Sequence, residues 1–134
     1  FPFGGPPFAP FLAWARESGV LSQAPIGPLV HPETGLWTSF RGALLFAEAV
    51  TGVPTAPAPP CATCAAEPCR SACPVDAFAG GQYDVPRCRA FLRTPEGADC
   101  MTRGCAARRA CPVGQGFAPD SERAMLHMRA FRGA

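Results

Sequence analysis

The residues of this chain that could carry chemistry are eight cysteines, all between Cys61 and Cys111. The first four form the pattern C-x2-C-x4-C-x3-C-P, and the second four also end in a Cys-Pro pair. Thiolates bind zinc and iron–sulfur clusters, and a closed site of either kind takes four protein ligands. Eight cysteines therefore supply enough ligands for two such sites.

In each run, the cysteine that precedes proline indicates how the ligands are divided between two sites. In two-cluster ferredoxins, three cysteines of a run hold one [4Fe-4S] cluster, and the fourth ligates the other cluster. This crossing rule predicts two sets of four ligands, and hence two [4Fe-4S] clusters. We assign Cys61, Cys64, Cys69 and Cys111 to cluster one, and Cys73, Cys88, Cys100 and Cys105 to cluster two.

Two spacings depart from the usual motif. Four residues separate Cys64 from Cys69 where two are usual, and five separate Cys105 from Cys111 where three are usual. We expect these longer loops still to reach their clusters. The main alternative is structural zinc at two four-cysteine sites, although zinc ligands usually come as paired C-x2-C knuckles and this chain has one such pair.

A disulfide framework is a further alternative that the distribution of the cysteines disfavours. Disulfide scaffolds scatter cysteines across the fold, whereas roughly the first sixty residues here and the last twenty carry none. The start of the chain lacks both a charged signal-peptide region and a methionine, so it resembles no secretory signal and is compatible with a cut end. We expect a reducing, cytoplasmic location.

The composition predicts a small, loop-rich protein. The 134 residues include 14 glycines and 17 prolines, so long regular elements cannot dominate, and bound clusters would replace part of the hydrophobic core. The formal charge is +2 with no long basic run, which gives no support to a nucleic-acid partner. No apolar run approaches the roughly 20 residues that cross a bilayer, so we expect no membrane partner.

We expect an α+β fold in three parts: an N-terminal segment over residues 1–50, a proline-rich linker over 51–60 and a ferredoxin-like, mostly helical domain over 61–134. The first part should hold a short helix over 11–18 and a β-hairpin over 27–40 that continues as a strand to Phe46. So small a sheet leaves an exposed edge. We therefore expect its partner sheet to be missing or to belong to another subunit, which allows a homo-oligomer.

The second half should be helical. We expect a helical turn over 68–73, a helix over 86–93 that aims Cys88 inward above Phe91 and Leu92, and a segment over 98–109 interrupted at Gly104. A last helix, capped by Asp120 or Ser121, should run to Phe131 and lie over a cluster or the hairpin. The arginines near the cysteines (Arg87, Arg89, Arg108 and Arg109) are more typical of a solvated surface than of a docking site.

Two stretches resemble known families. The runs C-R-S-A-C-P-V-D-A-F, Y-D-V-P-R-C-R-A-F-L and G-C-A-A-R-R-A-C-P-V resemble the ferredoxin-like module of epoxyqueuosine reductase and related cobalamin-linked reductases. This resemblance covers about residues 61–116 and implies the same crossing of Cys73 and Cys111. The run H-P-E-T-G-L-W-T-S-F-R-G-A-L-L-F, residues 31–46, resembles a strand-turn-strand piece of the cobalamin decyanase family.

Three functional hypotheses follow. The first is an electron carrier with two [4Fe-4S] clusters and a redox partner protein. The second is an internal electron relay of a reductase whose longer form binds flavin or cobalamin. The third is a structural zinc module. No hydrolytic constellation or phosphate-binding loop is present, and His31 and His127 lie outside the cysteine stretch, so we expect no catalytic residue and no enzyme activity from this chain alone.

Overall fold

The computed structural model describes residues 4–52 and 57–133. It combines short helices with one small antiparallel sheet, as the predicted α+β class requires. The α-helices of this described part are α1 (Phe11–Glu17), α2 (Pro68–Ser71), α3 (Val85–Phe91), α4 (Ala98–Arg103), α5 (Ala106–Arg109) and α6 (Ser121–Arg132). The strands are β1 (Ser22–Gln23) and β2 (Leu29–Val30), and 3-10 helices cover η1 (Pro60–Thr63), η2 (Pro95–Gly97) and η3 (Gln115–Phe117).

The helices begin and end close to the predicted positions because local signals set their ends. Proline occupies the first turn of α2 and α3, where its missing N–H costs nothing. Asp84 caps α3 by accepting a hydrogen bond from the Arg87 amide, and Asp120 caps α6 in the same way through the Arg123 amide. Gly104 separates α4 from α5, as predicted.

The structure has a hairpin, but it lies over residues 22–30 and not over the predicted 27–40. Ser22 pairs with Val30 and Gln23 with Leu29, and a single bridge then joins His31 to Gly35. Residues 38–46, expected to continue a strand to Phe46, have no regular structure. A strand needs a hydrogen-bonded neighbour, and none of the described residues pairs with this run, which leaves Leu44 and Leu45 85% and 87% exposed.

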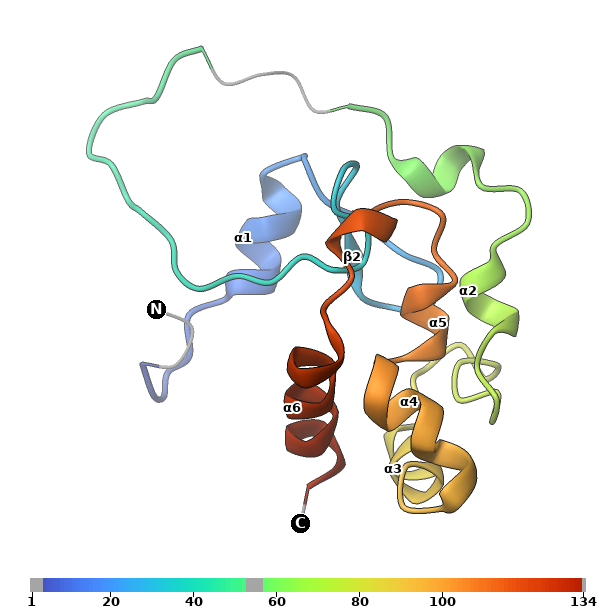
Figure 1. The fold of residues 1–134 in the computed structure, drawn as a ribbon. Coiled ribbons are helices and arrows are strands. Elements are labelled where there is room, and N and C mark those ends of the chain that lie inside the picture. The colour runs from blue at the N-terminus through green and yellow to red at the C-terminus, as the bar shows by residue number, and fades with distance from the viewer. Residues whose placement is uncertain (1–3, 53–56, 134) are drawn as a thin grey trace.

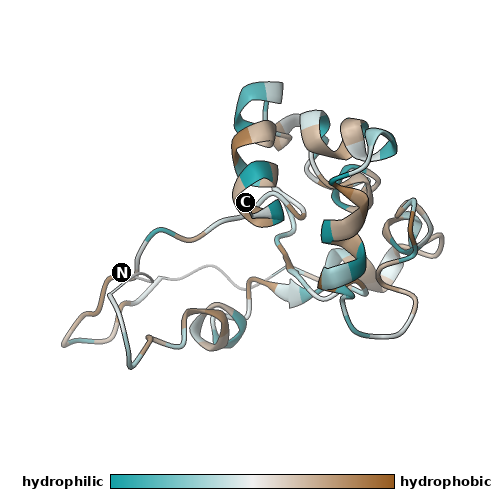
Figure 2. Ribbon diagram, turned by 90° about the horizontal axis from the view of Figure 1, so that it is seen from below, coloured by the Kyte–Doolittle hydropathy of each residue, from teal (hydrophilic) through white to brown (hydrophobic). Residues whose placement is uncertain are grey.

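The helices of the second half of the chain pack together, whereas much of the N-terminal part lies apart from them. α6 packs mainly against α4, and α2 against α5. Figure 1 shows residues 38–52 leaving this body as a long arch. Figure 2 shows α1 and the arch set apart from the packed helices. Within the described residues no helix is both long and apolar enough to span a membrane.

The main hydrophobic core joins the hairpin region to the cysteine-bearing helices. It consists of Ala24, Ile26, Val30, Leu36, Cys69, Ala107 and Cys111. The division into residues 1–50, 51–60 and 61–134 stays a prediction, and part of the linker, residues 53–56, lies outside the described residues. The core nevertheless shows that residues 24–36 pack directly on the segments that carry two of the predicted ligands.

Two glycines let the hairpin region approach the end of the cysteine stretch. Gly35 and Gly114 both have positive φ, +60° and +76°. A Cβ on Gly114 would lie 2.2 Å from the Thr34 carbonyl oxygen, and one on Gly35 would lie 2.1 Å from that of Val113. Backbone therefore packs on backbone here, and only glycine satisfies both the conformation and the space.

Candidate metal centres

The first cavity gathers the four cysteines assigned to cluster one. Three come from η1, α2 and the turn between them, and Cys111 arrives from the far end of the cysteine stretch. Cys69 and Cys111 are buried, and Cys61 and Cys64 are partly exposed. The rest of the lining is apolar apart from Glu67: Ala24, Pro25, Val30, Leu36, Pro60, Pro68, Pro112 and Val113.

Both lengthened loops have a structural explanation. Between Cys64 and Cys69 the chain makes a turn and then passes through Glu67, whose φ of +37° redirects the backbone into α2. Between Cys105 and Cys111 the five intervening residues include the whole of α5. The extra length therefore changes the path between ligands, while the thiols still face their cavities.

The electrostatics of the first cavity reflect crowded thiols in an apolar lining. Burial raises the pKa of Cys61, and the neighbouring Cys111, Cys69 and Cys64 raise it further. Burial and Cys111 also raise the pKa of Cys69. Four thiolates here would repel one another unless a cationic core lay between them. The donor set therefore fits a cationic metal centre.

The second cavity gathers the four cysteines assigned to cluster two. Unlike the first set, these come from four separate places in the fold: Cys73 follows α2, Cys88 lies in α3, Cys100 lies in α4, and Cys105 precedes α5. Burial raises the pKa of Cys88, and Cys105, Cys73 and Cys100 raise it further. The remaining lining residues include aromatic and sulfur-bearing side chains: Phe78, Tyr83, Phe91, Phe131 and Met128.

Backbone amides donate hydrogen bonds to sulfur in the second cavity. The Ala77 amide lies 3.4 Å from Cys73 Sγ and donates to it. Burial raises the pKa of the Cys105 thiol, and the backbone amides of Arg108 and Ala107 partly offset that rise. Such donors stabilise negative charge on sulfur, as ligation to a cluster requires.

A stack of aromatic rings closes one side of the second cavity. Tyr83 lies between Phe78 and Phe131, with ring centroids 4.7 Å and 6.0 Å apart. Burial raises the pKa of the Tyr83 hydroxyl, and the neighbouring Cys88 thiol raises it further. Sequence reasoning assigned Tyr83 no role, although its position five residues before Cys88 was the available signal.

Arg108 is not the solvated residue that the sequence predicted. Both Nε and Nη2 donate to the Leu36 carbonyl oxygen, the Nε distance being 2.9 Å, and the guanidinium lies 4.6 Å from the centroid of the Trp37 ring. Arg109 likewise pairs with Asp99 and donates to the Gly104 carbonyl oxygen. Arg108 and Arg109 therefore link the helix that follows Cys105 to Leu36 and to α4.

A zinc ion and a cluster place different geometric demands on four thiolates. A zinc ion needs all its thiolates about 2.3 Å from one point, whereas a cubane binds each thiolate at a different corner. Among the described residues, no three His, Cys, Asp or Glu side chains converge closely enough to hold one metal ion. All eight thiols are free, and each set of four lines one cavity.

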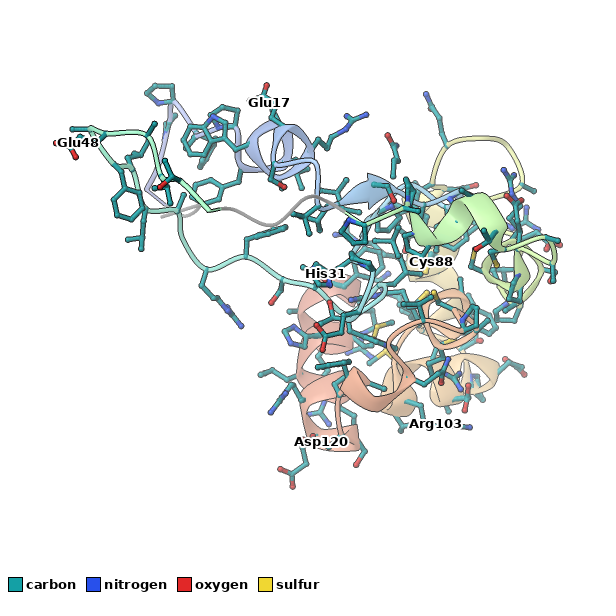
Figure 3. All side chains as sticks on the ribbon, turned by 90° about the horizontal axis from the view of Figure 1, so that it is seen from above. Glu17, His31, Glu48, Cys88, Arg103 and Asp120 are labelled. Atoms are coloured by element: carbon teal, nitrogen blue, oxygen red, sulfur yellow. The ribbon has the colours of Figure 1, made fainter. Side chains whose placement is uncertain are left out.

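The two histidines have different surroundings. His31 Nδ1 accepts hydrogen bonds from the Glu33 and Thr34 amides, which gives it a role in the turn. His127 is exposed on α6 at the edge of the second cavity. Figure 3 shows Cys88 among the helices, with Glu48 at the far end of the arch.

Comparison of the chain with protein-family models, with curated proteins and with solved structures found no match.

Proposed function

We propose that this chain transfers electrons through two [4Fe-4S] clusters. The supporting observation is the division of the eight thiols into two sets of four around two cavities, in the order that the crossing rule predicts. Cys61, Cys64, Cys69 and Cys111 would hold one cluster, and Cys73, Cys88, Cys100 and Cys105 the other. When bound, the clusters would accept and release single electrons.

The residues of the chain would bind the two clusters, shield them from water and adjust their reduction potentials. Apolar groups around the first cavity exclude water, and amide donors around the second stabilise negative charge on sulfur. We assign no proton transfer to any side chain, because electron transfer between clusters needs none. The partner would be another redox protein in the cytoplasm, and the chain would work without nucleic acid or membrane.

An internal relay within a larger reductase is a second candidate. The resemblance of residues 61–116 to the ferredoxin-like module of cobalamin-linked reductases favours it, and the exposed apolar run at Leu44 and Leu45 is compatible with packing against further protein. In that case a longer form should bind flavin or cobalamin, and this chain alone should not. Equilibrium binding of either cofactor to both forms separates the two candidates.

Metal analysis tests the proposal directly. Protein purified without oxygen should contain about eight iron and eight acid-labile sulfide per chain, and its brown absorbance should bleach with dithionite. A colourless protein with about two zinc would overturn the proposal and establish a structural module.

A further inference from the structure

We propose that the C-terminal ends of α3 and α6 form a basic docking face for an acidic redox protein, which exchanges single electrons with cluster two. The face consists of Arg89, Arg93, Arg129 and Arg132. This inference rests on the proposed function, because it concerns the partner of a cluster. It goes further by naming the surface that the partner contacts and the charge that the partner carries.

The two parts of the chain carry opposite formal charge. Residues 85–134 contain nine arginines and four acidic residues, a formal charge of +5, whereas residues 1–84 contain three arginines and six acidic residues, a formal charge of −3. Close to the first site, Glu67 and Arg70 form an ion pair with each other. The excess positive charge therefore belongs to the helices around the second site.

Hydrogen bonds bring the ends of α3 and α6 together. Arg89 Nε donates to the Phe131 carbonyl oxygen at 2.9 Å, and Arg93 Nη2 donates to the Arg132 carbonyl oxygen at 3.1 Å. Arg129 lies three residues before Arg132 on α6, and both line an open depression together with Arg93. None of the described residues that line this depression is acidic. Figure 1 shows α3 and the C-terminal end of α6 at the same end of the packed helices.

Much of the charge on this face has no carboxylate to balance it. The acceptor of Arg89 is a neutral carbonyl group, which fixes the direction of the guanidinium without cancelling its charge. The Arg129 and Arg132 side chains form no ion pair within the part of the chain that the structure describes. Positive charge at a helix C-terminus is favourable in itself. It also leaves a positive potential that an acidic surface would complement.

One aromatic ring separates this face from the second cavity. The Arg89 guanidinium lies 5.2 Å from the centroid of the Phe131 ring, and Phe131 lines the cavity together with Cys88. Cys88 is only partly buried. A protein bound to the face would therefore come close to cluster two. An acidic protein fits this position better than a nucleic acid, since no lysine and no long basic run extends the face.

The first test measures the binding of fluorescently labelled poly-L-glutamate to the full-length, iron-loaded chain by fluorescence anisotropy. Arg129→Gln combined with Arg132→Gln removes two charges from the face, and we expect binding to weaken by roughly tenfold. Arg16→Gln combined with Arg70→Gln is the matched control, since it removes the same charge from the other part of the chain. Arg129→Lys combined with Arg132→Lys keeps the charge and should retain binding.

The second test connects the face to cluster two. The hexacyanoferrate(III) anion takes one electron from a reduced cluster and becomes hexacyanoferrate(II). We expect the two glutamine substitutions at Arg129 and Arg132 to slow this reaction, and poly-L-glutamate to inhibit it in the wild-type chain. The hexaammineruthenium(III) cation is the matched oxidant, and the same substitutions should not slow its reduction.

Four results would overturn the inference while the proposed function stands. Equal losses of binding in the two glutamine variants would show that net charge, and not this face, attracts the polymer. Tighter binding of an oligothymidylate of equal charge would assign the face to nucleic acid. Bound poly-L-glutamate that leaves the hexacyanoferrate(III) rate unchanged would separate the face from cluster two. Loss of iron from the Arg129 and Arg132 variants would make these arginines structural.

A wild-type chain without iron is the result that overturns the proposed function, and the role of the face in electron exchange fails with it.

Discussion

The two cysteine sites are built on opposite plans. The first takes three thiols from one short run and lies against the hairpin core, with a nearly uniform apolar lining. The second takes one thiol from each of four segments and is surrounded by amide donors, aromatic rings and α6. One site is set mainly by local sequence and the other by the packing of helices.

The largest expected effect comes from replacing either of the last two cysteines of the first run by alanine. Cys69 and Cys73 are four residues apart but face different cavities. Cys69→Ala should remove cluster one and Cys73→Ala cluster two, each leaving about four iron per chain. Iron analysis and the paramagnetic spectrum of the remaining cluster measure this. Identical residual spectra would contradict the crossing assignment.

Breaking the close packing beside the first site should have the next largest effect. Gly114→Ala forces a Cβ to 2.2 Å from the Thr34 carbonyl oxygen at a φ of +76°. The strain alone is worth about 1–3 kcal/mol, and the backbone clash adds to it. Chemical denaturation should show a clear loss of stability.

Gly116→Ala is the matched control for that experiment. A Cβ at Gly116 meets nothing within 4 Å, although the residue lies only two positions further along the chain. Its stability should remain close to wild type. Equal losses in both variants would show that the contact between residues 34–35 and 113–114 contributes nothing.

A smaller effect is expected from Arg108→Lys. Lysine keeps the charge but cannot reproduce the two donors that reach the Leu36 carbonyl oxygen or the planar contact with Trp37. We expect a loss of about 1–2 kcal/mol in the free energy of unfolding. Arg103→Lys, at an exposed position, is the control and should be nearly neutral.

The smallest effect concerns the cap of α6, next to the second site. The Arg123 amide lowers the pKa of Asp120 by donating to its carboxylate. Its stabilising contribution is therefore complete above the ordinary aspartate pKa and is lost as pH falls through the lowered value. Amide hydrogen exchange of α6 should speed up in Asp120→Ala, and much less in Asp120→Asn, because asparagine also caps helices.

The sequence predicted what local chemistry determines. Proline and aspartate signals placed α3 and α6 correctly, because a helix end depends on a few adjacent residues. The strand to Phe46 was wrong because pairing depends on a distant partner that periodicity does not reveal. For the same reason the sequence did not reveal the contact of Arg108, whose hydrogen-bond acceptor is the Leu36 carbonyl oxygen, 72 residues away.

For the candidate sites, the two cavities group the cysteines into the same two sets of four as the crossing rule, while their role as ligands and the identity of the metal stay predictions. Sequence reasoning did not single out Tyr83, because its place at the second cavity depends on ring contacts with Phe78 and with Phe131 of α6. Candidate ligands are marked by residue type and spacing, whereas the residues around them become visible only in the fold.

Because Cys73 is assigned to the second set and Cys111 to the first, the second site lies within the stretch of sequence that the first site spans. Every cysteine of the second set lies between Cys69 and Cys111, so a loop closed by a cluster at the first site would enclose the whole of the second site. Loss of an outer cluster would free the ends of this loop, whereas loss of an inner one would leave a long unconstrained loop at modest entropic cost. Oxidative damage would therefore leave different partly assembled forms, depending on which cluster is lost first.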